Sequence, residues 1–187
     1  MISEHISQVE GAAAASNGDW HDVCVVGISA KSTKILVYAD SAVFSGAESL
    51  LCEVVSGLAA DPRFEVAFVA PESSTDLVDA LRAATGNDPE ASVPAQPLPL
   101  AALHLYDPRR RKSIAATLSG IDADVMLLNL PSAEYGATPL LETGALAFPV
   151  VGLMHISRTM AELGFRLGSI RTVLTRHAVR NLESVCV

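Results

Sequence analysis

The sequence predicts an α/β domain with a mostly parallel sheet and helices on both faces. From Lys34 onward, short apolar runs alternate with helical patterns, which is typical of repeated βα units. Two runs, Asp124–Leu130 and Phe148–Met154, are so apolar that we expect them near the centre of the sheet. A chain of 187 residues is long enough for one full-sized core. Together these features indicate a Rossmann-like three-layer domain.

Five parallel strands are expected from the apolar runs. The stretch from residue 91 to residue 108 contains too many prolines for a central strand, so it should form a short edge strand followed by a loop. The carboxyl ends of parallel strands meet at one edge, where Gly46 and His155 should both lie. The five strands are Lys34–Ala39, Phe64–Ala70, Asp124–Leu130, Phe148–Met154 and Arg171–Thr175.

Cap and turn residues mark the helices between these strands. The first helix should begin at Ser45–Glu48 and end before Asp61. The second should start at Ser73 or Ser74 and end at Gly86. Asp107 should cap the third helix, with Pro108 in its first turn. The remaining helices are expected over Thr138–Leu146, shortly after Ser157, and over Arg176–Val185.

Residues 1–33 differ in character from the rest of the chain. They are small, polar and without periodicity, apart from one short candidate strand at Asp22–Ser29. We therefore expect a mobile leader or linker at 1–33 and the folded domain at 34–187.

Charge, hydropathy and cysteine content exclude several classes of protein. The net charge of −8 argues against a nucleic-acid partner, which would require a basic surface. The longest uncharged apolar stretch, Gly144–Met154, is 11 residues long, whereas a membrane-spanning helix needs about 20. Three scattered cysteines fit no metal-site spacing and suggest a reducing compartment. We expect a cytoplasmic protein without a metal or other cofactor.

The stretch Ser45–Glu48 suits two interpretations at the exit of the first strand. Ser45 and Glu48 have the spacing of a capping box, in which each side chain satisfies a free backbone N–H. That motif does not explain Gly46, which is either a turn glycine or part of a loop that approaches a phosphate closely. The chain contains neither GxGxxG nor GK[ST], so neither a dinucleotide fingerprint nor a P-loop is indicated.

The order of these motifs resembles a known family. "ILVYADSAVFSGAESLLCEVVSGLAADPRFEVAFVAP" is similar to the opening of the N-terminal domain of family 4 glycosyltransferases of the GT-B fold. In that domain a strand, a glycine-rich turn followed by Ala-Glu, and a leucine-rich helix precede a strand that ends in Ala-Pro. The resemblance continues through "DADVMLLNLPS", "FPVVGLMH" and "TVLTRHAVRNL", and covers about residues 34–185. It implies one half of a GT-B fold.

The resemblance also implies an activity and a set of site residues. The activity is transfer of a sugar from a nucleotide sugar to a hydroxyl of a glycan or lipid-linked acceptor. His155 would act as the catalytic residue beside the transferred sugar, Ser45 and Gly46 would lie near the donor phosphate, and Asn129 would line the acceptor side. The family's second domain supplies most donor contacts, and the chain stops at Val187 where that domain would begin. We therefore expect this chain to lack the second domain and to be inactive alone.

The basic run Arg109–Lys112 and the overall function each leave alternatives open. The run is either a solvated helix face or a binding surface. As a binding surface it would contact an anionic acceptor or membrane headgroups through Arg109. Contact with headgroups would place the protein at the inner face of the membrane as a peripheral protein. His155 by itself could be a structural residue at a strand end. The whole chain could also be a non-catalytic Rossmann-like binding or partner module, or an unrelated flavodoxin-like or nucleotide-binding domain.

Overall fold

The computed structural model describes residues 32–96, 104–132, 135–156, 161–164, 167–180, 182 and 184–186. The predicted leader, with its candidate strand at Asp22–Ser29, lies outside the described residues. So do Ser157 and the three residues after it, where a short helix was expected.

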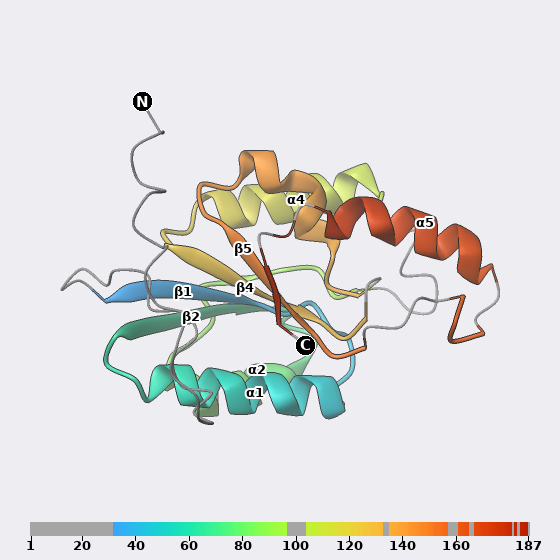
Figure 1. Ribbon diagram of the computed structural model, residues 1–187. Coiled ribbons are helices and arrows are strands. Elements are labelled where there is room, and N and C mark those ends of the chain that lie inside the picture. Colours follow the sequence, from blue (N-terminus) through green and yellow to red (C-terminus); the bar gives the residue numbers. More distant parts are fainter. Residues whose placement is uncertain are drawn as a thin grey trace, which may run out of the picture. The chain divides into compact units, whose positions relative to one another are not determined.

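A parallel six-stranded sheet forms the middle layer of this part of the chain (Figure 1). The strands run in the order β3-β2-β1-β4-β5-β6, and every neighbouring pair is parallel. The α/β, Rossmann-like fold class predicted from the sequence is confirmed. The strands are β1 Thr33–Tyr38, β2 Phe64–Ala70, β3 Ala91–Ser92, β4 Val125–Leu130, β5 Val150–Met154 and β6 Ser184–Cys186.

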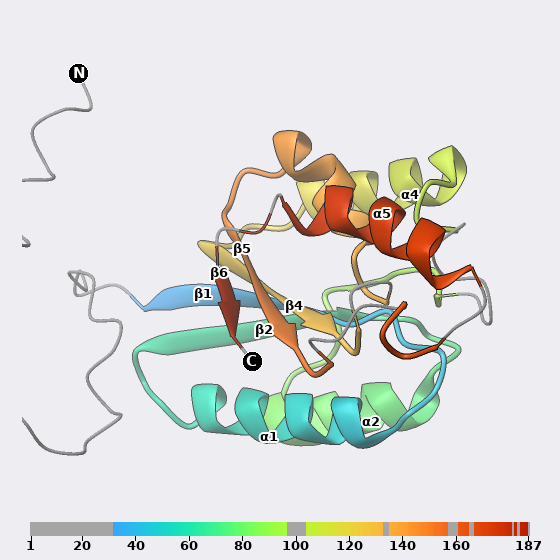
Figure 2. The same cartoon turned by 45° about the vertical axis from the view of Figure 1, so that its right-hand side comes forward.

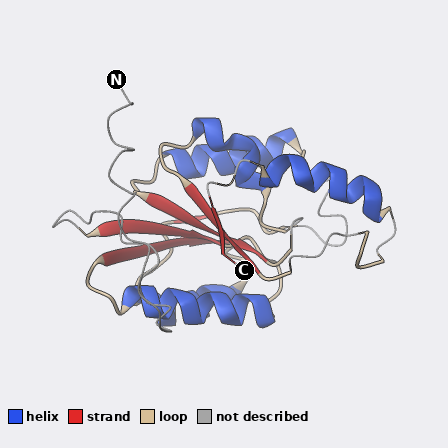
Figure 3. Ribbon diagram, in the orientation of Figure 1, coloured by secondary structure: helices blue, strands red, loops and turns tan. Residues whose placement is uncertain are grey.

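Helices cover both faces of the sheet (Figures 1 and 3). One face carries α1, Gly46–Ala59, and α2, Thr75–Thr85. The other carries α4, Pro108–Ser119, the 3-10 helix η1, Thr138–Ala145, and α5, Gly168–Val179.

Two hydrophobic clusters, one on each face of the sheet, hold the layers together. Successive residues of β1 alternate between them, because side chains of a strand point to opposite faces in turn. Leu36 and Tyr38 belong to the cluster that includes Ile114 of α4, and Ile35 and Val37 belong to the one that includes Leu51 of α1. A strand buried on both faces reads as a continuous apolar run, which explains why "KILVYA" was recognisable in the sequence.

Several helix ends lie where their capping residues predicted. Asp107 accepts a hydrogen bond from the backbone N–H of Arg109 at 2.9 Å, and Pro108 occupies the first turn of α4. At the other end of α2, Gly86 takes a left-handed conformation with φ of 74° and donates its N–H to the carbonyl of Arg82. Glycine reaches this conformation without steric cost, so it commonly terminates helices in this way.

The expected last strand and last helix were wrong. Arg171–Thr175 lies inside α5, which ends at Val179, and the strand is β6 at Ser184–Cys186 rather than a continuing helix to Val185. Thr175 and Ala178, three residues apart, are buried while Val173 is 69% exposed. This spacing is that of a helix with one buried side. Burial of that side outweighs the preference of the β-branched residues for a strand.

Two further boundaries differ from the prediction. Thr138–Ala145 is helical as expected, but it is a 3-10 helix. Strand β5 begins at Val150 and lies between β4 and β6, so β1 and β4, and not β5, occupy the centre of the sheet.

Candidate functional site

The strand order reverses between β1 and β4, and this reversal creates a crevice. After β1 the chain moves outward through β2 and β3, then returns to place β4 on the other side of β1. The next helices, α1 after β1 and η1 after β4, cover opposite faces (Figure 1). In open α/β sheets, ligands bind outside the carboxyl ends of the strands at such a reversal.

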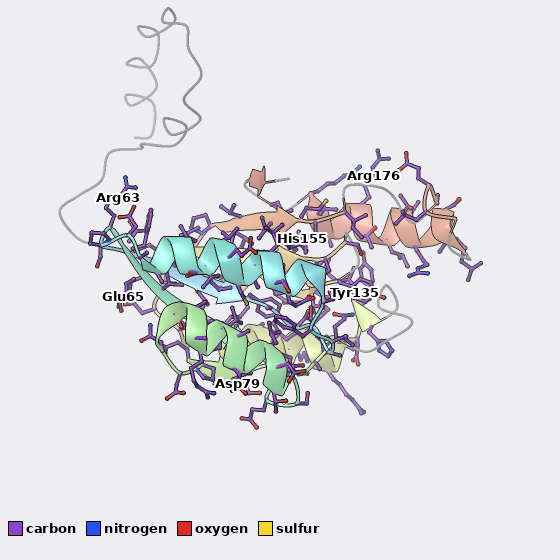
Figure 4. All side chains as sticks on the ribbon, turned by 90° about the horizontal axis from the view of Figure 1, so that it is seen from below. Arg63, Glu65, Asp79, Tyr135, His155 and Arg176 are labelled. Carbon is purple, nitrogen blue, oxygen red and sulfur yellow. The ribbon has the colours of Figure 1, made fainter. Side chains whose placement is uncertain are left out.

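A cavity of about 150 Å³ occupies this position. Its walls come from the segment that joins β1 to α1, from the first turns of α1, and from the residues after β4. Figure 4 shows Tyr135 beside the start of α1, whereas Arg63 and Glu65 lie at the opposite end of the sheet. The lining residues are Ser41, Ala42, Val43, Ser45, Glu48, Gln96, Pro131 and Tyr135.

The Glu48 carboxylate is the hub of the polar contacts around the cavity. Although Glu48 is only 1% exposed, its oxygens accept four hydrogen bonds. The donors are the Ser41 hydroxyl at 2.5 Å, the Ser45 hydroxyl at 2.5 Å, the Ser45 backbone N–H at 3.0 Å and the Asn129 amide at 3.5 Å. A buried carboxylate requires such partners, and here they tie the β1–α1 segment to the start of α1.

Asn129 connects this hub to His155. The Asn129 amide nitrogen donates toward Glu48, so its oxygen accepts from Nε2 of His155 at 2.7 Å. Asn129 is the fifth residue of β4 and pairs in register with Leu153 of β5, which places it two residues from His155 on the adjacent strand. The three side chains therefore form a continuous relay from α1 across β4 to the end of β5.

The hydrogen-bond direction defines the state of the His155 ring. A ring that donates through Nε2 carries its proton there when neutral, which leaves Nδ1 as an acceptor. Burial lowers the pKa of His155, and the charge of Glu48 opposes this shift only in part. The imidazole is therefore neutral at pH 7. Within the described part of the chain, Nδ1 has no hydrogen-bond partner.

A buried ion pair supports the back of the crevice. The Arg110 guanidinium contacts the Asp40 carboxylate at 2.6 Å, and their side chains are 6% and 2% exposed. Tyr38 donates its hydroxyl to the same carboxylate at 3.1 Å, and Arg110 also donates to the carbonyl of Ala95 at 2.8 Å. Because the N–H of Gln96 donates to the carbonyl of Asp40 at 2.7 Å, this cluster fixes the segment after β3 over the end of β1.

The structure brings four of the five predicted site residues together. Ser45, Gly46, Asn129 and His155 all lie at the carboxyl edge of the sheet, and Gly46 and His155 share that edge as expected. Ser45 and Glu48 form the predicted capping box at the start of α1.

Gly46 is not a turn glycine. It is the first residue of α1, its φ is not positive, and a Cβ added to it would meet no atom within 4 Å. Neither backbone conformation nor packing requires glycine here.

Arg109, the fifth predicted site residue, does not line the crevice. Arg109 is exposed on α4, and it is Arg110 that reaches the crevice and pairs with Asp40. Arg111 pairs with Glu142. The run is therefore only partly a solvated face, because its members lie on different sides of one helix.

Sequence reasoning missed the roles of Asp40, Arg110 and Gln96. Asp40 gave a usable signal, since a charged residue directly after a buried strand requires a partner. Its partner is 70 residues away, and nothing in the local sequence distinguishes Arg110 from its neighbours.

A second, more polar cavity of about 240 Å³ lies at the amino ends of the strands and is lined by Lys34, Glu65, Glu90 and Asp122 among others. It is remote from the reversal point and from the relay. Over the described ranges no group of three or more His, Cys, Asp or Glu side chains could hold a metal ion. No helix within those ranges has both the length and the apolar character to cross a membrane.

Comparisons with known proteins identify no family for this chain. No protein-family model matches the chain, and no curated protein matches its sequence. Among solved structures, the crystal structure of HAL3 from Cryptococcus neoformans is similar over 83% of this chain and 84% of its own. The two are 17% identical, with a TM-score of 0.37.

Proposed function

We propose that this chain is the acceptor-side half of a nucleotide-sugar-dependent glycosyltransferase of the GT-B fold and family 4 type. One observation carries the proposal. The loop before α1 and His155, which the sequence resemblance pairs in one site, lie on the same edge of the sheet and are joined through Glu48 and Asn129.

The start of α1 suits the donor diphosphate. The first N–H groups of a helix have no acceptor within the helix, and its dipole favours negative charge there. Gly46 is exposed and has open space around its α-carbon. Because glycine has no side chain, a phosphate oxygen could approach the backbone here more closely than it could with any other residue at this position.

His155 suits the transferred sugar. Its neutral ring is held by Asn129 and offers Nδ1 as an acceptor for a sugar or acceptor hydroxyl. In the transfer, the acceptor oxygen bonds to the anomeric carbon, and the bond from that carbon to the diphosphate oxygen breaks. The diphosphate leaves with the electron pair, and the proton of the acceptor hydroxyl passes to a phosphate oxygen of this leaving group. Binding energy positions the two reactants, and fixed dipoles stabilise the developing charge.

We infer three further partners from the proposed activity: a second domain, a sugar acceptor and a nucleotide sugar. A second Rossmann-like domain would close the crevice and supply most donor contacts, so this half alone should bind nucleotide sugar weakly and catalyse nothing. The acceptor would be a glycan or a lipid-linked sugar, met in the cytoplasm or at the inner face of the membrane. The nucleotide sugar is a substrate, and no metal ion is required.

A non-catalytic binding module is the second candidate. The Glu48 oxygens already accept hydrogen bonds from hydroxyl and amide groups of the chain itself. Such internal bonding is expected of a purely structural network, and it favours this second candidate.

Replacement of His155 by alanine in the complete gene product distinguishes the two candidates. If His155 contacts the reacting sugar, turnover per folded molecule should fall by roughly 100-fold or more, the scale of a lost positioned polar group. His104→Ala is the matched control, because His104 takes no part in the relay from Glu48 through Asn129 to His155. Turnover should be followed with a panel of UDP- and GDP-sugars, and folding by circular dichroism. Near-normal turnover of the His155 variant would remove it from the site.

A further inference from the structure

The outer face of α5 combines exposed apolar side chains with exposed basic side chains. Leu167, Ile170 and Val173 are 67%, 59% and 69% exposed, although large apolar side chains are usually buried. Leu167 directly precedes α5, and Ile170 and Val173 follow at intervals of three residues, so the three form a stripe along the start of the helix. Single exposed apolar residues need no explanation, but a contiguous group marks an interaction surface.

Basic residues continue the same exposed face toward the end of the helix. Arg176, His177 and Arg180 are exposed, and none of them forms a salt bridge with any described residue. The opposite side of α5 is the one that packs inward, through Thr175 and Ala178. The outer face is therefore apolar in its first half and basic in its second, where Arg176 and Arg180 carry positive charge. We call Leu167, Ile170, Val173, Arg176, His177 and Arg180 the α5 surface.

The charge of this segment contrasts with that of the whole chain. Between Glu162 and Glu183 there is no acidic residue, and four of the chain's 13 Lys and Arg residues fall in this interval. The remainder of the chain is strongly acidic, since the total is −8. A local cationic helix on an acidic protein selects an anionic partner and directs the protein to approach it with this face.

An anionic lipid surface fits both properties at once. Amphipathic helices that lie in the membrane interface present Leu, Ile or Val to the acyl chains and Arg or Lys to the headgroups. Nucleic acid would use the arginines but not the apolar stripe, and a protein partner of matching apolar shape would not need the cations.

We propose that the α5 surface docks this protein on membranes that carry anionic phospholipids. This inference is independent of the proposed transfer activity. If both hold, docking brings the crevice close to a lipid-linked acceptor, because α5 extends past the carboxyl ends of the strands (Figures 1 and 2).

The test is flotation of the full chain with vesicles. One set contains phosphatidylcholine only, and the other contains equal parts phosphatidylcholine and phosphatidylglycerol. The protein should float with the anionic vesicles and not with the neutral ones, and roughly 0.5 M NaCl should release much of it, because the Debye length then falls below about 5 Å.

Two double variants separate the contributions of the α5 surface. Arg176→Gln with Arg180→Gln should weaken partitioning roughly 30-fold, as expected for two cations at an anionic surface. Ile170→Ser with Val173→Ser should also release the protein, because it removes the apolar contact. All four side chains are exposed, so circular dichroism should show an unchanged fold.

Matched controls make the test specific. Leu50→Ser removes an exposed apolar side chain from α1, and Arg109→Gln with Lys112→Gln removes two exposed cations from α4; neither should alter flotation. Loss of flotation only in the α4 variant would overturn the proposal in favour of the basic run. It would also be overturned by equal binding to neutral vesicles, by no binding to anionic ones, or by ultracentrifugation showing that the α5 variants merely dissociate a dimer.

Discussion

Replacement of Arg110 by methionine should destabilise the fold strongly. In the native structure its guanidinium lies 2.6 Å from the Asp40 carboxylate, and both side chains are almost fully buried. Methionine fills much of the same space without charge, so Asp40 would keep only the Tyr38 hydroxyl as a side-chain partner. Removing one member of a buried ion pair costs about 3–5 kcal/mol of unfolding free energy, because the other charge is left uncompensated.

The loss should depend on pH in a defined direction. Burial raises the pKa of Asp40, and Arg110 opposes that rise. Without Arg110 the pKa of Asp40 should rise further. An acid whose pKa is higher in the folded than in the unfolded state loses stability as the pH rises through the folded value. The deficit of the variant relative to the native chain should therefore be largest at neutral pH and shrink as the pH falls below the pKa of Asp40 in the variant.

Urea unfolding followed by circular dichroism at several pH values measures both effects. Asp40→Asn with Arg110→Met should recover part of the loss, because it removes the unpaired charge as well as its partner. Arg109→Met, one residue earlier but exposed, should change the unfolding free energy by no more than about 0.5 kcal/mol. A loss for Arg110→Met below about 1 kcal/mol, or one equal at all pH values, would refute the assignment of this pair as a buried support of the crevice.

Two glycines of the crevice should respond in opposite ways. Gly136→Ala should lower the melting temperature severely, because a Cβ at this position would lie 2.0 Å from the carbonyl oxygen of Asn129 and φ is 81°; an unchanged melting temperature would contradict this backbone path. Gly46→Ala should preserve stability or raise it by up to about 1 kcal/mol, since the new methyl group meets open space. The same substitution should weaken nucleotide-sugar binding measured by calorimetry, and undiminished affinity would exclude Gly46 from the phosphate site.

The first two thirds of the fold could be predicted because its signals are local. Buried parallel strands such as Phe64–Ala70 are continuous apolar runs, and Asp107 and Gly86 mark helix ends through contacts within a few residues. The parallel order then follows from the βα alternation, which places Gly46 and His155 at one edge.

The last part of the chain could not be predicted in this way. In Arg171–Thr175, β-branched residues favour a strand locally, whereas the burial of Thr175 and Ala178 against the rest of the domain stabilises a helix. Propensity is a weak preference, and tertiary packing overrides it.

The candidate site was predictable only at its strand ends. His155 and Asn129 each come at or directly after the end of a buried strand, so the parallel topology places them together. The partners that position them are distant in sequence: Glu48 lies 81 residues from Asn129, and Arg110 lies 70 residues from Asp40. A capping box explained Glu48 completely at the local level, and this hid its second role as the hub of the relay.

Chemical-shift mapping of nucleotide-sugar binding tests the central claim, that the crevice between β1 and β4 is the functional site, most directly. UDP- and GDP-sugars would be titrated into the isotope-labelled chain, and the backbone amides that shift would be assigned. We predict weak, millimolar binding with the largest shifts at Ser45–Glu48, Asn129 and His155. Micromolar affinity centred elsewhere, or the absence of any shift at these residues with every donor, would contradict the account.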